Sequence, residues 1–158
     1  MAISDAKLLF SDAQAITASD ISDNVYNSGP LFTGNTGINW GVGTPLDMLI
    51  NVDTTFADTG SDSTVTVTVE SDSTEDLATS PTVHGTAQVL AALSAAGTVV
   101  RIRLNPDDNY EQYIGLRYTV TGGNLSAGAV TAVLVPSAAP VENAGDFASA
   151  LNIVTPTA

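Results

Sequence analysis

Apolar and polar residues alternate along much of the chain, and this alternation is the main structural signal in the sequence. It is clearest in YIGLRYTVTGGNLSAGAVTAVLV at 113–135 and in STVTVTVE at 63–70. A period of two residues places successive side chains on opposite faces of a β-strand. The pattern therefore predicts strands with one face in a core and the other face toward water.

The same period recurs at 46–53 and 99–104, and shorter strands are predicted at 7–17, 24–26, 83–84 and 88–93. Turn signals such as GNTG, ADTGSDS and NPDDN separate these segments. About eight strands at this spacing, without an amphipathic helix, predict an all-β antiparallel sandwich of the jelly-roll type. The shared register predicts that the core contains Met48, Ile50, Val65, Val67, Ile102, Leu104, Leu116, Tyr118 and Leu134.

Two hairpins follow from reading neighbouring strands as partners. The segment 113–135 is interpreted as one hairpin that turns at Gly122-Gly123. A second hairpin across NPDDNYEQ would gather Arg101, Arg103 and Arg117 into one basic patch, which could bind an acidic partner surface. The alternative is that each arginine pairs across its sheet with an acidic residue, which contributes less than about 1 kcal/mol per exposed pair.

The chain is interpreted as a jelly-roll domain at 1–136 and a C-terminal arm or tail at 137–158. The tail is rich in Ala and Pro, and DFASALNIV is its one apolar stretch. Phe147 and Leu151 are predicted to contact a partner, because apolar side chains are poorly placed in water; a disordered tail is the alternative. Trp40, in a glycine-rich loop, is either a lid over one end of the sandwich or an interface anchor.

Composition narrows the possible partners. The net charge is −13, from 17 acidic residues against four basic ones, so we expect neither nucleic acid nor membrane as a partner. The absence of cysteine excludes disulfides and thiolate metal sites, and it suits a reducing cytoplasm. The N-terminal sequence lacks a signal-peptide pattern, and no apolar run approaches the ~20 residues of a membrane helix.

The sequence offers little reactive chemistry. His84 is the single histidine, it lies in TVHG, and no G-x-S-x-G motif accompanies it, so we interpret it as a structural or exposed strand residue. The acidic stretch 58–70 does not match the spacing of an EF-hand loop. Asp107, Asp108 and Glu111 are interpreted as parts of a solvated hairpin loop, and the alternative is a site for an adventitious cation. We therefore expect no enzymatic activity, no metal and no cofactor.

Three segments occur in a characteristic order: LLFSDAQAIT at 8–17, GVGTPL at 41–46, and the stretch 113–135 with its TVTGG. Together they resemble the small jelly-roll cement proteins of tailed-bacteriophage heads, over roughly residues 7–136. The resemblance implies a non-enzymatic virion protein, made in the host cytoplasm, that sits on the exterior of the head as a homodimer. Such a protein binds the phage major capsid protein and stabilises the shell by bridging its subunits.

Two other classes of function stay open at this point. A carbohydrate-binding decoration module of a phage particle would have the same fold, but should display aromatic residues beyond Trp40 and the four tyrosines. A hydrolase would need two facing carboxylates, which a sequence alone does not reveal.

Overall fold

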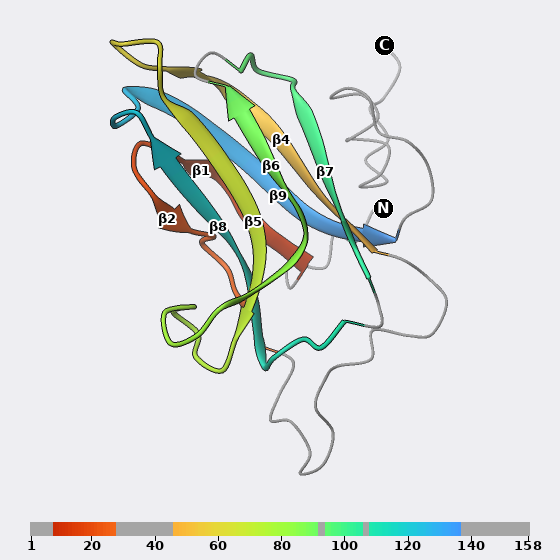
Figure 1. Ribbon diagram of the computed structural model, residues 1–158. Coiled ribbons are helices and arrows are strands. Elements are labelled where there is room, and N and C mark those ends of the chain that lie inside the picture. Colours follow the sequence, from red (N-terminus) through yellow and green to blue (C-terminus); the bar gives the residue numbers. More distant parts are fainter. Residues whose placement is uncertain (1–7, 28–45, 92–93, 106–107, 137–158) are drawn as a thin grey trace, which may run out of the picture.

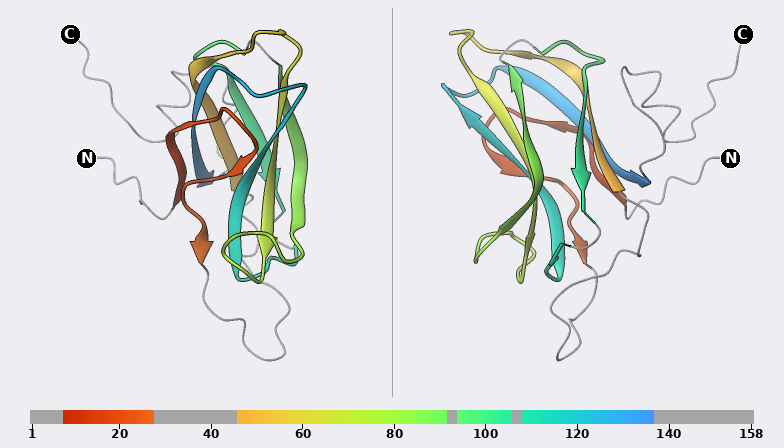
Figure 2. Two further views of the ribbon diagram at one scale, coloured as in Figure 1. Left: turned by 90° about the vertical axis from the view of Figure 1, so that its left-hand side faces the viewer. Right: turned by 45° about the vertical axis from the view of Figure 1, so that its right-hand side comes forward.

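The computed structural model describes residues 8–27, 46–91, 94–105 and 108–136, which form two facing antiparallel β-sheets (Figures 1 and 2). The described ranges contain no α-helix. The strands are β1 (Leu9–Ala15), β2 (Asp20–Ile21), β3 (Tyr26–Asn27), β4 (Leu46–Ala57), β5 (Thr64–Asp72), β6 (Thr82–Ala91), β7 (Val99–Leu104), β8 (Tyr113–Thr121) and β9 (Ala127–Pro136).

The strand order is that of a jelly roll. Sheet A has the order β1-β9-β4-β7, and sheet B has the order β2-β8-β5-β6, with β3 pairing with β8 as well. Apart from the β5–β6 hairpin, each connection from β3 onward carries the chain from one sheet to the other (Figure 1). The predicted fold class, an all-β antiparallel sandwich of jelly-roll type, is confirmed.

The core lies between the two sheets and is built by the period-two pattern. In sheet B, Val65, Val67 and Val69 point inward, and in sheet A Met48 and Ile50 face them. All nine residues that the sequence placed in the core are buried. The core also takes up side chains that the pattern did not place there: Phe10, Ile16, Phe56, Tyr110 and Leu125.

Both predicted hairpins are wrong. β8 and β9 do not pair: Gly122 and Gly123 carry the chain from sheet B to sheet A, where β9 lies between β1 and β4. The strand at 99–104 likewise pairs with β4, and not with β8. The alternation identified the buried face of each strand correctly, but it contains no information about which strand lies beside it.

Two glycines allow close approaches that hold the sandwich together. At Gly128, with φ of 151°, a Cβ atom would lie 2.0 Å from Cδ1 of the buried Phe56. Gly85, with φ of 69°, lies in a bulge of β6, and a Cβ there would lie 2.6 Å from the backbone oxygen of Arg103. This bulge joins the two short predicted strands at 83–84 and 88–93 into the single strand β6.

Candidate docking faces of the two sheets

The three arginines of the predicted basic patch lie on different sheets. Arg101 and Arg103 project from β7 of sheet A, and both approach Asp47 of β4, at 3.5 and 3.4 Å. Arg117 projects from β8 of sheet B and pairs with Glu70 of β5 at 2.7 Å. Because the outer faces of a sandwich point in opposite directions, the single patch does not form. The alternative prediction, that each arginine pairs with an acidic residue on a neighbouring strand, is confirmed.

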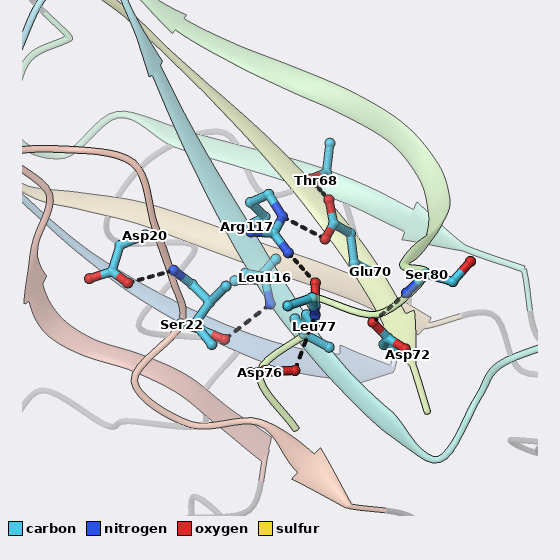
Figure 3. A network of polar contacts seen from close by, with 12 residues as sticks. Asp20, Ser22, Thr68, Glu70, Asp72, Asp76, Leu77, Ser80, Leu116 and Arg117 are labelled. Carbon is cyan, nitrogen blue, oxygen red and sulfur yellow. Dashed lines mark hydrogen bonds and ion pairs between the residues drawn. The ribbon is translucent and has the colours of Figure 1, made fainter. Parts of the chain in front are cut away.

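Arg117 and Glu70 form the centre of a polar network on the outer face of sheet B (Figure 3). Arg117 Nε donates to Glu70 Oε2 at 2.7 Å, and Arg117 Nη2 donates to the carbonyl of Leu77. Thr68 Oγ1 donates to the second carboxylate oxygen of Glu70 at 3.0 Å. The side chain of Glu70 is only 6% exposed, so its carboxylate oxygens are satisfied mainly by these donors and little by water.

The loop 73–80 folds over the same end of sheet B and is held by Asp72. The buried carboxylate of Asp72 accepts from the backbone N–H groups of Ser73, Thr79 and Ser80. Burial works against its ionisation, but these backbone hydrogen bonds outweigh burial and hold the pKa of Asp72 below its usual value. The loop thereby places the buried Leu77 over Gly115, where a Cβ atom would lie 2.9 Å from Leu77 Cδ1.

Beyond this network, the outer face of sheet B is covered by threonines. Thr64, Thr66 and Thr68 alternate along β5, and Thr119 and Thr121 lie beside them on β8. Thr66 is directly opposite Thr119, and the hydroxyls of Thr64 and Thr121 are 2.7 Å apart. We call these five residues the threonine face. All five are partly or fully exposed, and none of them carries a charge.

The outer face of sheet A has a different character, because apolar side chains cross it from strand to strand. Leu49 of β4 and Val133 of β9 lie at its centre, flanked by Leu9, Val99 and Val135. We call these five residues the apolar stripe. Leu49 is directly opposite both Val133 and Arg101 in the sheet, so the stripe borders the arginines of β7. The alternation at 46–53 places Leu49 out of phase with the core residues Met48 and Ile50, which agrees with its position on the outer face.

A buried polar cluster lies at the junction of β5, β6 and the segment before β8. Ser71 Oγ is 2.7 Å from His84 Nε2, and His84 Nδ1 is 3.4 Å from Asp108 Oδ2. Ser71 Oγ also accepts the backbone N–H of Glu111 at 3.0 Å, and the tautomer of the His84 ring decides which of Ser71 and His84 donates to the other. The ring of His84 packs against that of Tyr110, with the centroids 4.1 Å apart. Burial lowers the pKa of His84, while the hydrogen bond to Asp108 opposes this shift.

Ser71, His84 and Asp108 have the order of a catalytic triad, but their setting differs from that of a nucleophile. Ser71 is completely buried, so in this conformation no substrate reaches its hydroxyl. The hydrogen bonds of Ser71 and His84 instead hold the segment around Asp108 and Glu111 against β5 and β6. The sequence did not reveal this cluster, because 37 residues separate Ser71 from Asp108 and only the fold brings them together.

The acidic turn at 58–63 is also satisfied internally. Asp58 Oδ2 accepts from Ser63 Oγ at 2.8 Å and from the backbone N–H groups of Asp62 and Ser63. The Ser63 hydroxyl is the main reason that the pKa of Asp58 falls to about 2. Among the residues that the structure describes, no group of three or more His, Cys, Asp or Glu side chains could hold a metal ion.

Three of the predicted partner-binding residues, Trp40, Phe147 and Leu151, lie outside the described residues, as do the tail 137–158 and Asp107. The threonine face was missed, although its signal was in the sequence. In STVTVTVE the alternation that places the valines in the core also places the threonines between them on the other face.

Within the described residues, no helix is long and apolar enough to cross a membrane.

The chain was compared with curated proteins and with protein families. No curated protein matches it. The match among protein families is to Bbp16, over residues 10–134, a range that begins in β1 and ends in β9. Since this range takes in most of the chain, the protein belongs to the phage-related Bbp16 family.

Proposed function

We propose that this protein is a structural component of a phage particle that binds the outer surface of the capsid and bridges major capsid protein subunits. Membership of a phage-related family and the jelly-roll topology support the proposal. The observation that carries it is the threonine face, an uncharged and regular surface on a chain with a net charge of −13.

The physical case for docking through the threonine face rests on charge and on rigidity. The centres of protein interfaces are depleted in charged residues, which would have to be desolvated on binding. Thr66 and Thr119 are β-branched and lie on paired central strands, so their side chains lose little conformational freedom when a partner covers them. Their hydroxyls still donate and accept hydrogen bonds, which allows a specific contact with the polar surface of a shell.

Bridging strengthens a shell through mass action. A protein that binds only the assembled lattice stabilises it by about 2.7 kcal/mol per site when its free concentration is a hundred times Kd. An interface of ordinary size, about 1,600 Å² in total, provides such binding. We extend the proposal to a homodimer, because a dimer presents the threonine face twice and so contacts two neighbouring shell subunits at once.

The direct test compares heads assembled with and without the protein under heating or osmotic shock. We expect the decorated heads to retain their DNA at higher temperature and after stronger shock. Equal retention in both preparations would remove the capsid-stabilising function. Binding to a glycan array together with equal retention would instead support a carbohydrate-binding decoration module.

A second test locates the docking surface. The double variant Thr66→Asp/Thr119→Asp adds two charges to the centre of the threonine face, and we expect it to lose binding to heads while keeping its fold. Thr54→Asp/Thr55→Asp is the matched control, because these exposed threonines lie on β4 of sheet A. Sedimentation of each variant with undecorated heads gives the bound fraction. Equal binding by both double variants would exclude the threonine face as the contact.

A further inference from the structure

The burial of the apolar stripe is not explained by the described residues. Leu49 is 0% exposed and Val133 is 3% exposed, although both project from the outer face of sheet A. Figure 2 shows sheet A as one of the two layers of the described sandwich, with no described strand beyond its outer face. The other members of the stripe, such as Leu9 and Val99, stand beside these residues in the same sheet, and neighbours in a sheet do not cover one another from above.

A polar atom on the same face indicates that the cover is a polypeptide segment. Asn51 lies on β4 two residues after Leu49, and its Nδ2 donates to Asp53 Oδ1 at 2.7 Å. Its Oδ1 is buried and has no hydrogen-bond partner. A buried acceptor without a donor is costly, and a segment laid across this face would bring backbone N–H groups within reach of it.

From these observations we propose that the chain's own C-terminal segment, residues 137–158, packs on the apolar stripe. The segment follows directly on β9, whose Val135 is itself a member of the stripe. The stripe spans the four strands of sheet A, about 15 Å from the first to the last. The 22 residues of the segment extend much further than this, at about 3.3 Å per residue.

The chemistry of the segment matches that of the face. Its apolar side chains include Phe147, Leu151 and Val154, which would bury their surface against Leu49 and Val133. Its acidic residues are Glu142 and Asp146, and the stripe is bordered by Arg101 and Arg103 of β7. Among the described residues, Arg101 and Arg103 share the single carboxylate of Asp47, which leaves an excess of positive charge at the β7 edge of this face for an acidic segment.

The proposal is tested in the full-length protein by measuring which methyl groups a soluble paramagnetic agent reaches in NMR spectra. In the wild type we expect the methyl signals of Leu49 and Val133 to be protected as fully as those of Ile50, in the core. Phe147→Asp/Leu151→Asp should abolish that protection and leave Leu49 and Val133 relaxing as fast as Val83, which is 52% exposed. The matched control, Ala138→Asp/Ala139→Asp, adds the same charge to the same segment and should leave the protection intact.

Unchanged protection of Ile50 in each variant shows that the sandwich is still folded, so loss of protection at Leu49 alone is a specific result. The proposal is overturned if the Phe147/Leu151 variant keeps Leu49 and Val133 protected. It is also overturned if protection in the wild type disappears on dilution, because the cover would then be a second copy of the chain. Neither outcome bears on the threonine face, which lies on the other sheet.

Discussion

Replacing Arg117 with Met should destabilise the protein much more than its partly exposed position suggests. Arg117 is 32% exposed, but its partner Glu70 is only 6% exposed, so little water can replace the arginine as a donor to its carboxylate when the arginine is removed. Breaking a fully buried ion pair from one side costs about 3–5 kcal/mol. Since water reaches part of Arg117, we expect a smaller loss of about 2–3 kcal/mol in the free energy of unfolding.

The double variant Arg117→Met/Glu70→Met separates the charge from the packing. It removes both charges and keeps side chains of similar length, so we expect its stability to lie within about 1.5 kcal/mol of the wild type. The matched control is Arg103→Met. Arg103 is 62% exposed, and Asp47 retains its second arginine, Arg101, so the cost should stay below about 1 kcal/mol.

Urea denaturation followed by circular dichroism measures the wild type, the single variants Arg117→Met and Glu70→Met, the double variant and Arg103→Met under one set of conditions. At about 2–4 °C per kcal/mol for a domain of this size, Arg117→Met should also lower the Tm by roughly 5–10 °C. The reasoning is refuted if Arg117→Met lies within about 0.5 kcal/mol of the wild type. It is refuted equally if the double variant loses the sum of the two single losses, since the two charges would then be independent.

Three further predictions concern the core, a glycine and pH. Ile102→Asp should abolish the cooperative thermal transition, because an unpaired carboxylate buried between the sheets costs several kcal/mol; a wild-type transition would contradict the core assignment. Gly128→Ala should lower the free energy of unfolding by about 2 kcal/mol or more, through the clash with Phe56, whereas Gly60→Ala meets only the flexible side chain of a surface aspartate. Burial lowers the pKa of His84, so the unfolded chain binds the proton first as the pH falls below about 6.5, and stability should decline from there. His84→Gln should remove this part of the decline between about pH 6.5 and 5, and identical pH profiles would show that His84 does not contribute.

The sequence predicted the faces of the strands well and their partners badly. Leu116 and Leu134 were assigned to the core because each sits in phase with its neighbours at a period of two. Pairing depends on long-range contacts, and the same alternation suits any neighbour in either sheet. The length of the connection does not distinguish the two pairings either. The short polar loop around Gly122 is compatible with a hairpin and also with a crossing between sheets.

The candidate faces were harder to predict than the core for a related reason. The alternation puts Glu70 and Asp47 on the outer faces of their strands, yet both are buried, Glu70 beside Arg117 of β8 and Asp47 beside the two arginines of β7. Burial of a charge depends on what covers it, and for Glu70 the cover includes Arg117, which is 47 residues away in sequence. The threonines of β5, in contrast, follow from local alternation alone and were available from the sequence.

The position of β1 beside β9 determines when, relative to synthesis of the chain, the sandwich can complete its fold. Ser11 in β1 forms its hydrogen bond with Tyr118, which is 107 residues later in the chain, and the backbone partners of β1 come later still, in β9. While the ribosome is still synthesising β9, sheet A lacks the strand that lies between β1 and β4, so the sandwich closes only after synthesis of β9. Contacts that are this distant in sequence make folding slow. We therefore expect a delay between the synthesis of each copy and the completion of its fold.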